Sequence, residues 1–342
     1  MRSIFDSRLK ISQVIRSLNE DEEDLLPLRV ANLLPGQKVG FNVYLKVKNS
    51  TAKRMEFVIC CPQGEIFQPR WLETLKEKSI PWVYINSADL PLVLSYLQHN
   101  LSQLLDDNQL SSHEKAVLVY DATLLWTRHF FTCEKERMGK QIIQGTELVE
   151  GLFKCIQNKK FHYDLILQLC NHGQPLYTHS INTCLIGLGF TRYLGWPEAR
   201  IKAFGLGALL HDIGMTKIPP EVLYKSGPLL DEEWRQVQHH PADGFNMLKT
   251  FTNLCYDALL MVHQHHEQGD GGGYPDGLKL VSIHPWARIL RIIDSYEALT
   301  ARRNWRPPLP PFEALSVMRN QCDQSGVYHP NLLTFFIKFL AG

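Results

Sequence analysis

Two kinds of hydrophobic pattern divide this chain. Before residue 108, short runs alternate apolar and polar positions and are rich in β-branched and aromatic residues, which predicts strands. The predicted strands cover residues 38–47, 54–61 and 81–86. Apolar residues at helical spacing predict helices at 69–78 and 89–105. We therefore expect the first part of the chain to be a small α+β module.

The rest of the chain is predicted to be helical. From residue 113 to about 157 the pattern predicts one continuous helix, with the charged segment CEKERMGK (133–140) near its middle. Beyond it, helical patterns alternate with loops that contain glycine and proline. The expected fold class is mainly α. A regulatory or dimerisation module (1–112) precedes a connecting helix (113–147), which can also serve as a dimer seam, and an all-helical bundle (148–342).

Histidines and aspartates lie on the apolar stripes of four predicted helices. The stripe that contains Ile201 and Phe204 leads to His211, with Asp212 beside it. The same spacing groups His179 with Leu176 and Ile186, His265 with Ala258 and Val262, His266 with Leu259 and Val262, and Asp294 with Ala287 and Leu290. An ionised aspartate on a buried face is costly unless it is paired or binds a cation.

A cation can explain all of these polar residues together. One inward histidine alone is usually a hydrogen-bonded core residue, but several imidazoles and two carboxylates are hard to satisfy in one core without a cation. Imidazole and carboxylate ligands suit Fe, Mn, Ni, Co or Zn, and adjacent HD and HH pairs suit a site with more than one ion. A zinc site built from thiolates is excluded.

Composition narrows the class of protein. The 342 residues are 44% apolar, which suits two soluble globular domains. The formal net charge of +1 gives no general attraction to a nucleic acid polymer or to a membrane. The eight cysteines form no C-x-x-C pair and lie mostly in apolar runs, so we expect buried thiols in a reducing compartment. Because no apolar run approaches the roughly 20 residues of a membrane span, we expect a cytoplasmic protein.

Three spaced motifs carry a family resemblance. LLHDIG (209–214), HHEQGDGGGYPDGL (265–278) and RILRIIDSYEALTARR (288–303) resemble the HD-GYP subfamily of the HD phosphohydrolase superfamily. Further elements follow in the order of that family: IPPEVLYKSGPL, HHPADGF and PNLLTFFIKFL. The resemblance covers about residues 148–342.

The resemblance implies a bacterial signalling enzyme that hydrolyses cyclic di-GMP to linear pGpG, or on to GMP, at a centre of two or three metal ions that often contains iron. The implied metal ligands are His179, His211, Asp212, His240, His265, His266 and Asp294. Asp212 is the expected bridging ligand. Two cations about 3.5 to 4 Å apart would lower the pKa of a bridging water and polarise the phosphoryl oxygens for attack.

Two departures from the family pattern change these expectations. The lysine that often follows HDIG is replaced by Met215, so Lys217 becomes the candidate catalytic lysine beside His211 and Asp212. Members with three metal ions carry a glutamate where this chain has Pro175, and proline cannot bind a metal ion. We therefore expect two divalent ions, with iron favoured and manganese as an alternative, and pGpG as the product.

The resemblance also places substrate and partner contacts. It assigns substrate binding to Tyr274, Arg303 and Arg306, and makes the loop around Tyr274 a contact for GGDEF-domain proteins. Glycines in this loop are expected to turn the chain at positive φ, with Glu267 and Asp270 bracing the loop.

Some alternatives remain open. His239 and His263 are expected to be structural, because neither falls on a motif position. The protein can instead act on another cyclic dinucleotide, such as cyclic GMP-AMP, or serve as a metal-holding receptor or scaffold without turnover. A homodimer is also possible.

Overall fold

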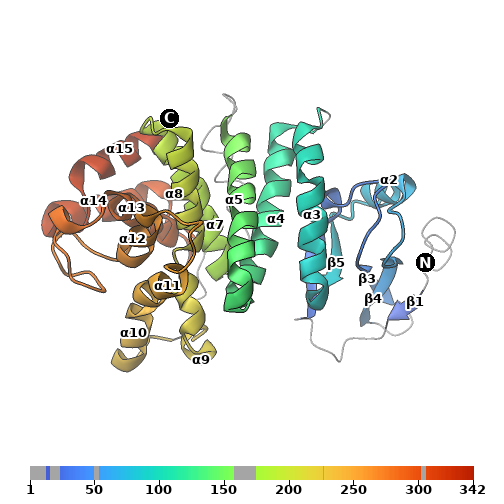
Figure 1. Cartoon of the computed structure of the whole chain (residues 1–342), viewed down its shortest axis with the longest axis horizontal. Coiled ribbons are helices and arrows are strands. Elements are labelled where there is room, and N and C mark those ends of the chain that lie inside the picture. The colour runs from blue at the N-terminus through green and yellow to red at the C-terminus, as the bar shows by residue number, and fades with distance from the viewer. Residues whose placement is uncertain are drawn as a thin grey trace. The chain divides into compact units, whose positions relative to one another are not determined.

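The chain folds into two compact units, residues 1–125 and 126–342. Figure 1 presents the computed structural model of the whole chain, and the boundary between the units falls within helix α4 (Ser112–Thr132). The described residues are 13–15, 24–49, 54–108, 110–157, 175–225, 227–301 and 306–342.

The first unit contains an antiparallel sheet with the strand order β1-β4-β3-β5-β2. Its strands are β1 (Gln13–Ile15), β2 (Leu25–Arg29), β3 (Val43–Asn49), β4 (Arg54–Cys61) and β5 (Trp82–Asn86). Its described helices, apart from the start of α4, are α2 (Pro69–Glu77), α3 (Leu90–Asp106) and the 3-10 turns η2 (Val30–Asn32) and η3 (Ser87–Asp89). The α+β expectation is confirmed for this unit.

The three predicted strands are present, but β1 and β2 were not predicted. Strand β5 shows why alternation works, because Val83 and Ile85 are buried while Trp82, Tyr84 and Asn86 are partly exposed. Strand β2 contains Pro27, which has no N–H to donate and which argues against a strand in the sequence. The sheet tolerates this proline because β2 lies at an edge.

The predicted continuous helix from 113 to 157 is wrong, because two helices occupy this range. Helix α4 ends at Thr132 and α5 (Lys135–Gln157) begins three residues later. The hydroxyl of Thr132 donates to the carbonyls of Arg128 and His129, at 3.1 and 3.2 Å, and such bonds compete with helix continuation. The indole N–H of Trp126 then donates to the carbonyl of Gln141, at 3.1 Å, which ties α4 to α5 beyond the break.

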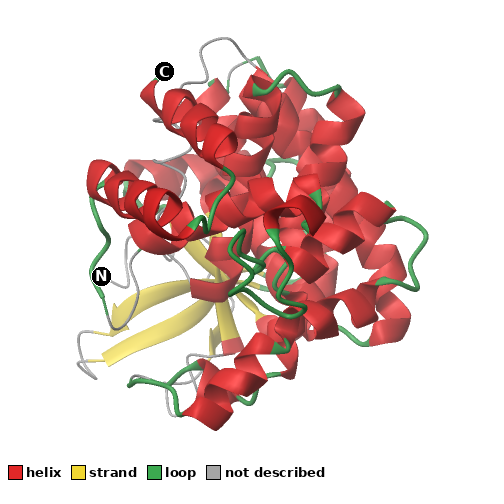
Figure 2. Ribbon diagram, turned by 90° about the vertical axis from the view of Figure 1, so that its left-hand side faces the viewer, coloured by secondary structure: helices red, strands yellow, loops and turns green. Residues whose placement is uncertain are grey.

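In the described part of the second unit the regular elements are helices, as Figure 2 shows in red. After α5 they are α7 (Pro175–Tyr193), α8 (Glu198–Leu210), η4 (Ile213–Lys217), α9 (Pro220–Leu223), α10 (Asp231–Gln238), α11 (His240–Leu248), α12 (Tyr256–Gln264), η5 (Leu280–Ser282), α13 (Pro285–Thr300), α14 (Pro311–Ser325) and α15 (Pro330–Ala341). The predicted mainly α fold with a helical C-terminal region is confirmed.

Buried aromatic rings join the helices that carry the predicted ligands. Phe204 of α8 lies 5.7 Å from Trp286 of α13, measured between ring centroids. Phe336 of α15 contacts both Phe190 of α7, at 5.1 Å, and Tyr296 of α13, at 5.4 Å. Because these rings are almost fully buried, they hold α7, α8 and α13 in fixed positions relative to one another.

Two further expectations concern thiols and membranes. Five of the seven described cysteines are buried and all seven are free, which agrees with the prediction of buried thiols; Cys170 lies outside the described residues. None of the described helices combines the length and the apolar character that crossing a bilayer requires.

Candidate metal centre

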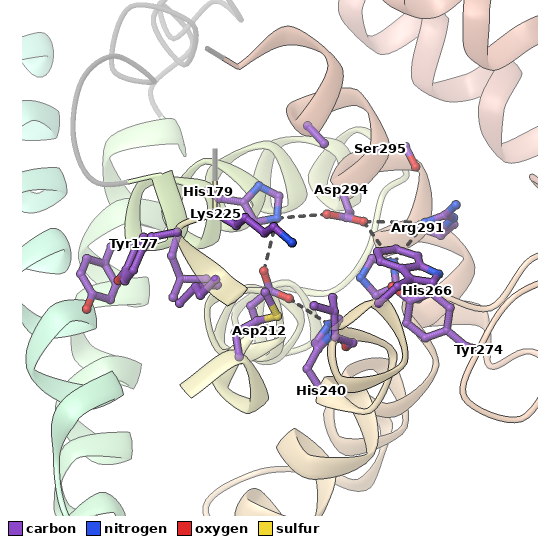
Figure 3. A pocket seen from close by; sticks show the side chains of 17 residues that line it. Tyr177, His179, Asp212, Lys225, His240, His266, Tyr274, Arg291, Asp294 and Ser295 are labelled. Atoms are coloured by element: carbon purple, nitrogen blue, oxygen red, sulfur yellow. Dashed lines mark hydrogen bonds and ion pairs between the residues drawn. The ribbon is translucent and has the colours of Figure 1, made fainter. Parts of the chain in front are cut away.

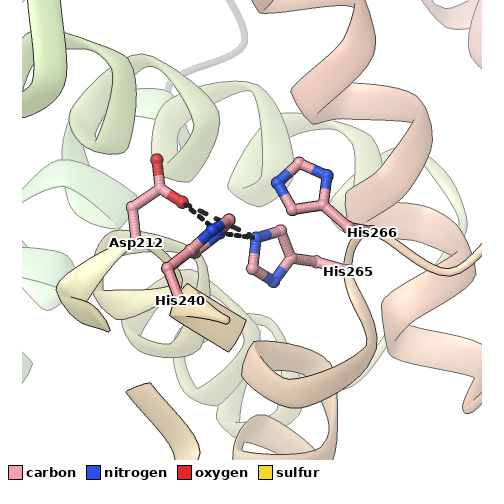
Figure 4. Close-up of side chains that lie close together, drawn as sticks. All are labelled: Asp212, His240, His265 and His266. Carbon is pink, nitrogen blue, oxygen red and sulfur yellow. Dashed lines mark hydrogen bonds and ion pairs between the residues drawn. The ribbon is translucent and has the colours of Figure 1, made fainter. Parts of the chain in front are cut away.

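All seven predicted ligands come together in the second unit. Their potential ligand atoms form two groups, within each of which all atoms lie within 4.8 Å of one another. The first group contains Asp212, His240, His265 and His266, and the second contains His179, His211 and Asp294. Figure 4 shows the first group, and Figure 3 shows members of both groups around one pocket. Six of the seven are buried, and only His266 is partly exposed.

Helix ends position three of the histidines. His211 and His265 directly follow α8 and α12, and His240 begins α11, two residues after the last residue of α10. Each points its Nδ1 at the carbonyl oxygen three residues earlier (Ala208, Val237 and Val262, respectively), at 2.7 Å in all three cases. Carbonyls in the last turn of a helix lack helical partners, and a carbonyl only accepts, so Nδ1 must carry the hydrogen. In the neutral form of such a ring, which is the form that binds a metal ion, Nε2 is an acceptor.

The Nε2 atoms of the three rings converge on one carboxylate oxygen. Nε2 of His240 lies 3.1 Å from Nε2 of His265. Nε2 of His211 is buried and has no hydrogen-bond partner among the described residues. Oδ1 of Asp212 lies 3.3, 3.4 and 3.6 Å from Nε2 of His240, His211 and His265, respectively. Three imidazole nitrogens around a carboxylate oxygen offer a set of ligand atoms that fits a divalent metal ion, and when the rings are neutral this set is repulsive unless a cation lies among them.

A buried glutamate fixes the orientation of His179 in the second group. Nε2 of His179 lies 3.0 Å from Oδ1 of Asp294, and its Nδ1 bonds to Oε2 of the buried Glu297. The other oxygen of Glu297 accepts from Nδ2 of Asn182, at 2.8 Å. A histidine that ligates a metal ion commonly donates its second ring N–H to a carboxylate in this way, which fixes the direction of the ligating nitrogen.

Two aspartates connect the groups. While Oδ1 of Asp212 faces the first group, its Oδ2 lies 3.7 Å from Nε2 of His179. Asp294 has the complementary arrangement, with Oδ1 near His179 and Oδ2 at 3.8 Å from Nδ1 of His266. Both carboxylates therefore have one oxygen on each side, as a bridging ligand requires.

The electrostatics of the metal-free protein favour ionised aspartates. Burial alone would raise the pKa values of Asp212 and Asp294, but the surrounding histidines hold both pKa values well below their usual range. Burial lowers the pKa of His265 to about 4, so this ring is neutral at physiological pH. For His179, burial also acts to lower the pKa, but the carboxylates of Glu297 and Asp294 outweigh it and raise the pKa to about 10. A metal ion at Nε2 of His179 must therefore displace a proton.

The glycine of the HDIG motif permits the close approach of α11 to the turn after Asp212. A Cβ atom at Gly214 would lie 1.9 Å from the carbonyl oxygen of His240, which is backbone and cannot move aside. The chain continues from Asp212 into η4, where the N–H of Met215 donates to the carbonyl of Asp212, at 2.9 Å. The turn thus brings the start of α11, and with it His240, against Asp212.

The glycine loop is braced as the sequence predicted. The buried carboxylate of Glu267 accepts the backbone N–H groups of Asp276 and Leu278, at 2.7 and 2.8 Å. Oδ1 of Asp270 accepts the N–H of Gly272, at 2.9 Å. Positive φ angles occur at Gly271 (81°) and Gly277 (66°), which confirms the expected turns.

Tyr274 lies where the loop meets the site. Its ring centroid is 4.8 Å from that of His266, with an interplanar angle of 31°. Burial raises the pKa of the Tyr274 hydroxyl, so the hydroxyl stays protonated.

The two ligand groups open into a pocket of about 390 Å³. Its lining combines five predicted ligands with aromatic, basic and apolar side chains (Figure 3). The lining residues are Leu176, Tyr177, His179, Asp212, Met215, Leu223, Tyr224, Lys225, Trp234, Val237, His240, His266, Tyr274, Arg291, Asp294, Ser295 and Ala298.

Two of the three predicted basic residues do not line this pocket. Lys217 is exposed at the end of η4 and is absent from the lining. Arg306 donates from Nη2 to the carbonyls of Ala298 and Leu299, at 2.8 and 3.1 Å, and so caps the end of α13 instead of lining the pocket. Arg303 lies outside the described residues.

The two histidines expected to be structural lie away from both ligand groups. His239 is exposed, although its neighbour in the chain is the buried His240. Nε2 of His263 lies 2.9 Å from Oδ2 of Asp276.

Several pocket residues were missed by the sequence reasoning. Lys225 and Arg291 supply the basic groups in the lining, and Nη1 of Arg291 lies 3.2 Å from Nδ1 of His266. Arg291 and Glu297 each lie three residues from Asp294 in α13, so helical spacing from a predicted ligand carried a signal for both. Lys225 and Trp234 carried no such signal, because nothing local shows which side chains of the α9 and α10 region face the site.

Comparisons with known proteins agree with this geometry. The sequence profile of a family described as HD domain matches residues 169–332. A cyclic di-GMP phosphodiesterase of Thermotoga maritima is 32% identical over 311 residues, which are 90% of this chain and 76% of the relative. A cyclic di-GMP phosphodiesterase of Pseudomonas aeruginosa is 30% identical over 204 residues, which are 59% of this chain and 49% of the relative. The chain therefore spans about half the length of the Pseudomonas relative.

A solved structure supports the fold alone. The HDG"Y"P protein Bd1817 of Bdellovibrio bacteriovorus superposes with a TM-score of 0.63 at 19% identity, and the match covers 93% of this chain and 100% of that chain. The sequence relative that matches along most of its own length, the HD-domain profile and the spaced HD and GYP motifs all agree. The chain belongs to the HD-GYP family of HD-domain proteins.

Proposed function

We propose that this chain is a metal-dependent phosphodiesterase that hydrolyses cyclic di-GMP to linear pGpG. The observation that carries the proposal is the convergence of five imidazole rings on two aspartates at the floor of an open pocket. A buried acceptor cluster that opens to solvent is suited to hold ions where a substrate can meet them.

We propose two divalent ions, with iron favoured and manganese as an alternative. The two ligand groups and the two bridging carboxylates support this number, and histidine with carboxylate ligands supports a transition metal. When bound, two such ions supply an activated water at neutral pH and polarise the phosphoryl oxygens. Pro175, at the start of α7, cannot add a ligand for a third ion, and this supports pGpG as the product.

The charges of the pocket explain why hydrolysis would depend on metal ions. A cyclic dinucleotide carries a negative charge on each phosphodiester, and Asp212 and Asp294 are held ionised on the floor of the pocket. Without bound cations the two carboxylates would repel the substrate. Arg291 and Lys225 add positive charge to the lining, and Arg291 is held close to the floor by its contact with His266.

Protein loaded anaerobically with Fe(II) or Mn(II) and incubated with cyclic di-GMP or cyclic GMP-AMP tests the proposal, with the products resolved by chromatography. We expect pGpG from cyclic di-GMP. Faster turnover of cyclic GMP-AMP would reassign the substrate. Binding of either nucleotide without any turnover would replace the enzyme with a receptor or scaffold.

Two adjacent histidines provide a matched pair of variants. His240→Ala removes a buried imidazole of the first ligand group and should abolish turnover, whereas His239→Ala removes its exposed neighbour and should leave turnover intact. Metal content, measured by mass spectrometry, should fall only in His240→Ala. Equal metal content and equal turnover in both variants would contradict the assignment of the first ligand group.

Roles can also be proposed for the other parts of the chain. We propose that residues 1–112 form a regulatory or dimerisation module, that residues 113–147 connect it, and that residues 148–342 form the phosphohydrolase domain. The braced loop around Tyr274 is the proposed contact for a GGDEF-domain protein. A rigid loop beside a pocket is a suitable docking element, because little conformational entropy is lost on binding.

A further inference from the structure

One wall of the pocket is built by the segment that contains α9 and α10, and the metal centre does not account for it. Tyr224, Lys225 and Trp234 line the pocket from this segment, and we call them the α9–α10 wall. The side chain of Tyr224 is 60% exposed and that of Trp234 is 45% exposed. The wall therefore lies at the mouth of the pocket, whereas the predicted ligands lie at its floor.

A series of aromatic rings leads from the floor to this wall. The ring of Tyr274 lies 4.8 Å from His266 on one side and 6.2 Å from Trp234 on the other, measured between centroids. The Trp234 and Tyr274 rings meet edge to face, at 84°. Exposed aromatic side chains gathered at the mouth of a pocket are typical of a surface that a flat or apolar ligand group covers.

The wall also holds a positive charge in place. Nζ of Lys225 lies 2.6 Å from Oε2 of Glu233, and the same oxygen accepts the backbone N–H of Leu230, at 2.6 Å. Glu233 is thereby fixed at the first turn of α10, and it fixes the ammonium group in turn. An ammonium group has three donors, so one bond to Glu233 leaves two for a ligand. The Lys225 side chain is 30% exposed, which keeps those donors accessible.

The chemistry of these groups matches one nucleotide, which is half of a cyclic dinucleotide. A nucleotide offers a flat base, which stacks on aromatic rings, and a phosphate, which accepts from ammonium groups. We propose that the α9–α10 wall is a nucleotide-binding subsite, in which Trp234 stacks on a base and Lys225 donates to a phosphate oxygen. This inference rests on the proposed function, because it assigns the recognition of the substrate in the same pocket.

Ligands that lack one part of a nucleotide separate the two roles. The full chain, loaded with Mn(II), is titrated with GMP, with guanosine, which has no phosphate, and with ribose 5-phosphate, which has no base. Trp234→Ala should weaken binding of GMP and guanosine by about 5- to 150-fold, the range for loss of one base stacking contact, and leave ribose 5-phosphate unchanged. Trp234→Phe should restore most of the loss, since phenylalanine keeps a flat ring.

Lys225 is expected to give the opposite selectivity. Lys225→Ala should weaken the binding of GMP and of ribose 5-phosphate by about 10-fold, which is the lower end of the range for a hydrogen bond to a charged group. The binding of guanosine should be unchanged. Lys249→Ala and Tyr256→Ala remove an exposed lysine and an exposed tyrosine outside the pocket, and they serve as matched controls.

Three results would overturn the inference. The first is that the unsubstituted protein does not bind GMP, and the second is that both wall variants keep unchanged affinities. The third is that a wall variant binds all three ligands equally more weakly, which would show a structural role. Failure of the proposed function looks different, because the unsubstituted protein would then turn over neither cyclic dinucleotide while the binding pattern of the wall variants persisted.

Discussion

The substitution Glu297→Gln should loosen metal binding without removing any predicted ligand. One carboxylate oxygen of Glu297 bonds to Nδ1 of His179 and the other accepts from Asn182. Because an amide has only one oxygen, its NH₂ group must then face one of these two donors. The amide is neutral, so the negative charge that makes the His179 ring a strong ligand is lost in either case, and the orientation of the ring is lost as well when the NH₂ group faces it. Replacing such a partner costs about 10- to 100-fold in metal affinity, which corresponds to about 1.4 to 2.7 kcal/mol.

Isothermal titration of metal-free protein with Mn(II) measures this effect directly. Glu56→Gln is the matched control, because Glu56 is also a buried glutamate but lies in strand β4 of the other unit. We expect weaker binding in Glu297→Gln and unchanged binding in Glu56→Gln. Full affinity in Glu297→Gln would refute the role of Glu297, and equal losses in both variants would show a general effect of the substitution.

Three further predictions concern stability and the loop. In the metal-free protein, the raised pKa of His179 means that its imidazolium stabilises the fold fully below pH 6.5 and that this contribution is lost as the pH rises toward 10. The melting temperature should therefore decline across that range, and the decline should be smaller in Glu297→Gln. Identical pH profiles in the two proteins would contradict this account. Gly214→Ala should lower the free energy of unfolding by about 3 kcal/mol, since the new Cβ meets the carbonyl of His240, and a denaturant titration that shows no loss would be inconsistent with the close approach. Glu267→Gln should cost about 1 to 3 kcal/mol, because only one of its two backbone donors keeps an acceptor, whereas Asp270→Asn, at an exposed position, should cost far less; similar costs for both would argue against the brace.

Local pattern was sufficient for most of the helical fold. The helices that carry His179, His211 and Asp294 have apolar residues at helical spacing, and the same spacing put these polar side chains on the buried face. The break between α4 and α5 was not predictable in this way, because the amphipathic pattern continues through it. It depends on the hydroxyl of Thr132 and on the contact between Trp126 and Gln141, which are distant along a continuous helix.

The sequence by itself determined which side chains gather at the candidate metal centre, because motif order and helical spacing are properties of neighbouring residues. The tertiary structure decided how those side chains work together. Carbonyl groups at helix ends bind Nδ1 of His211, His240 and His265, so that each ring presents Nε2 to the site. Glu297 bonds to His179, which lies 118 positions away along the chain. It also decided that Lys225, and not Lys217, lines the pocket. The reach of a side chain depends on the path of the backbone after Gly214 and on the packing of helices that are far apart in sequence, and no local pattern encodes either.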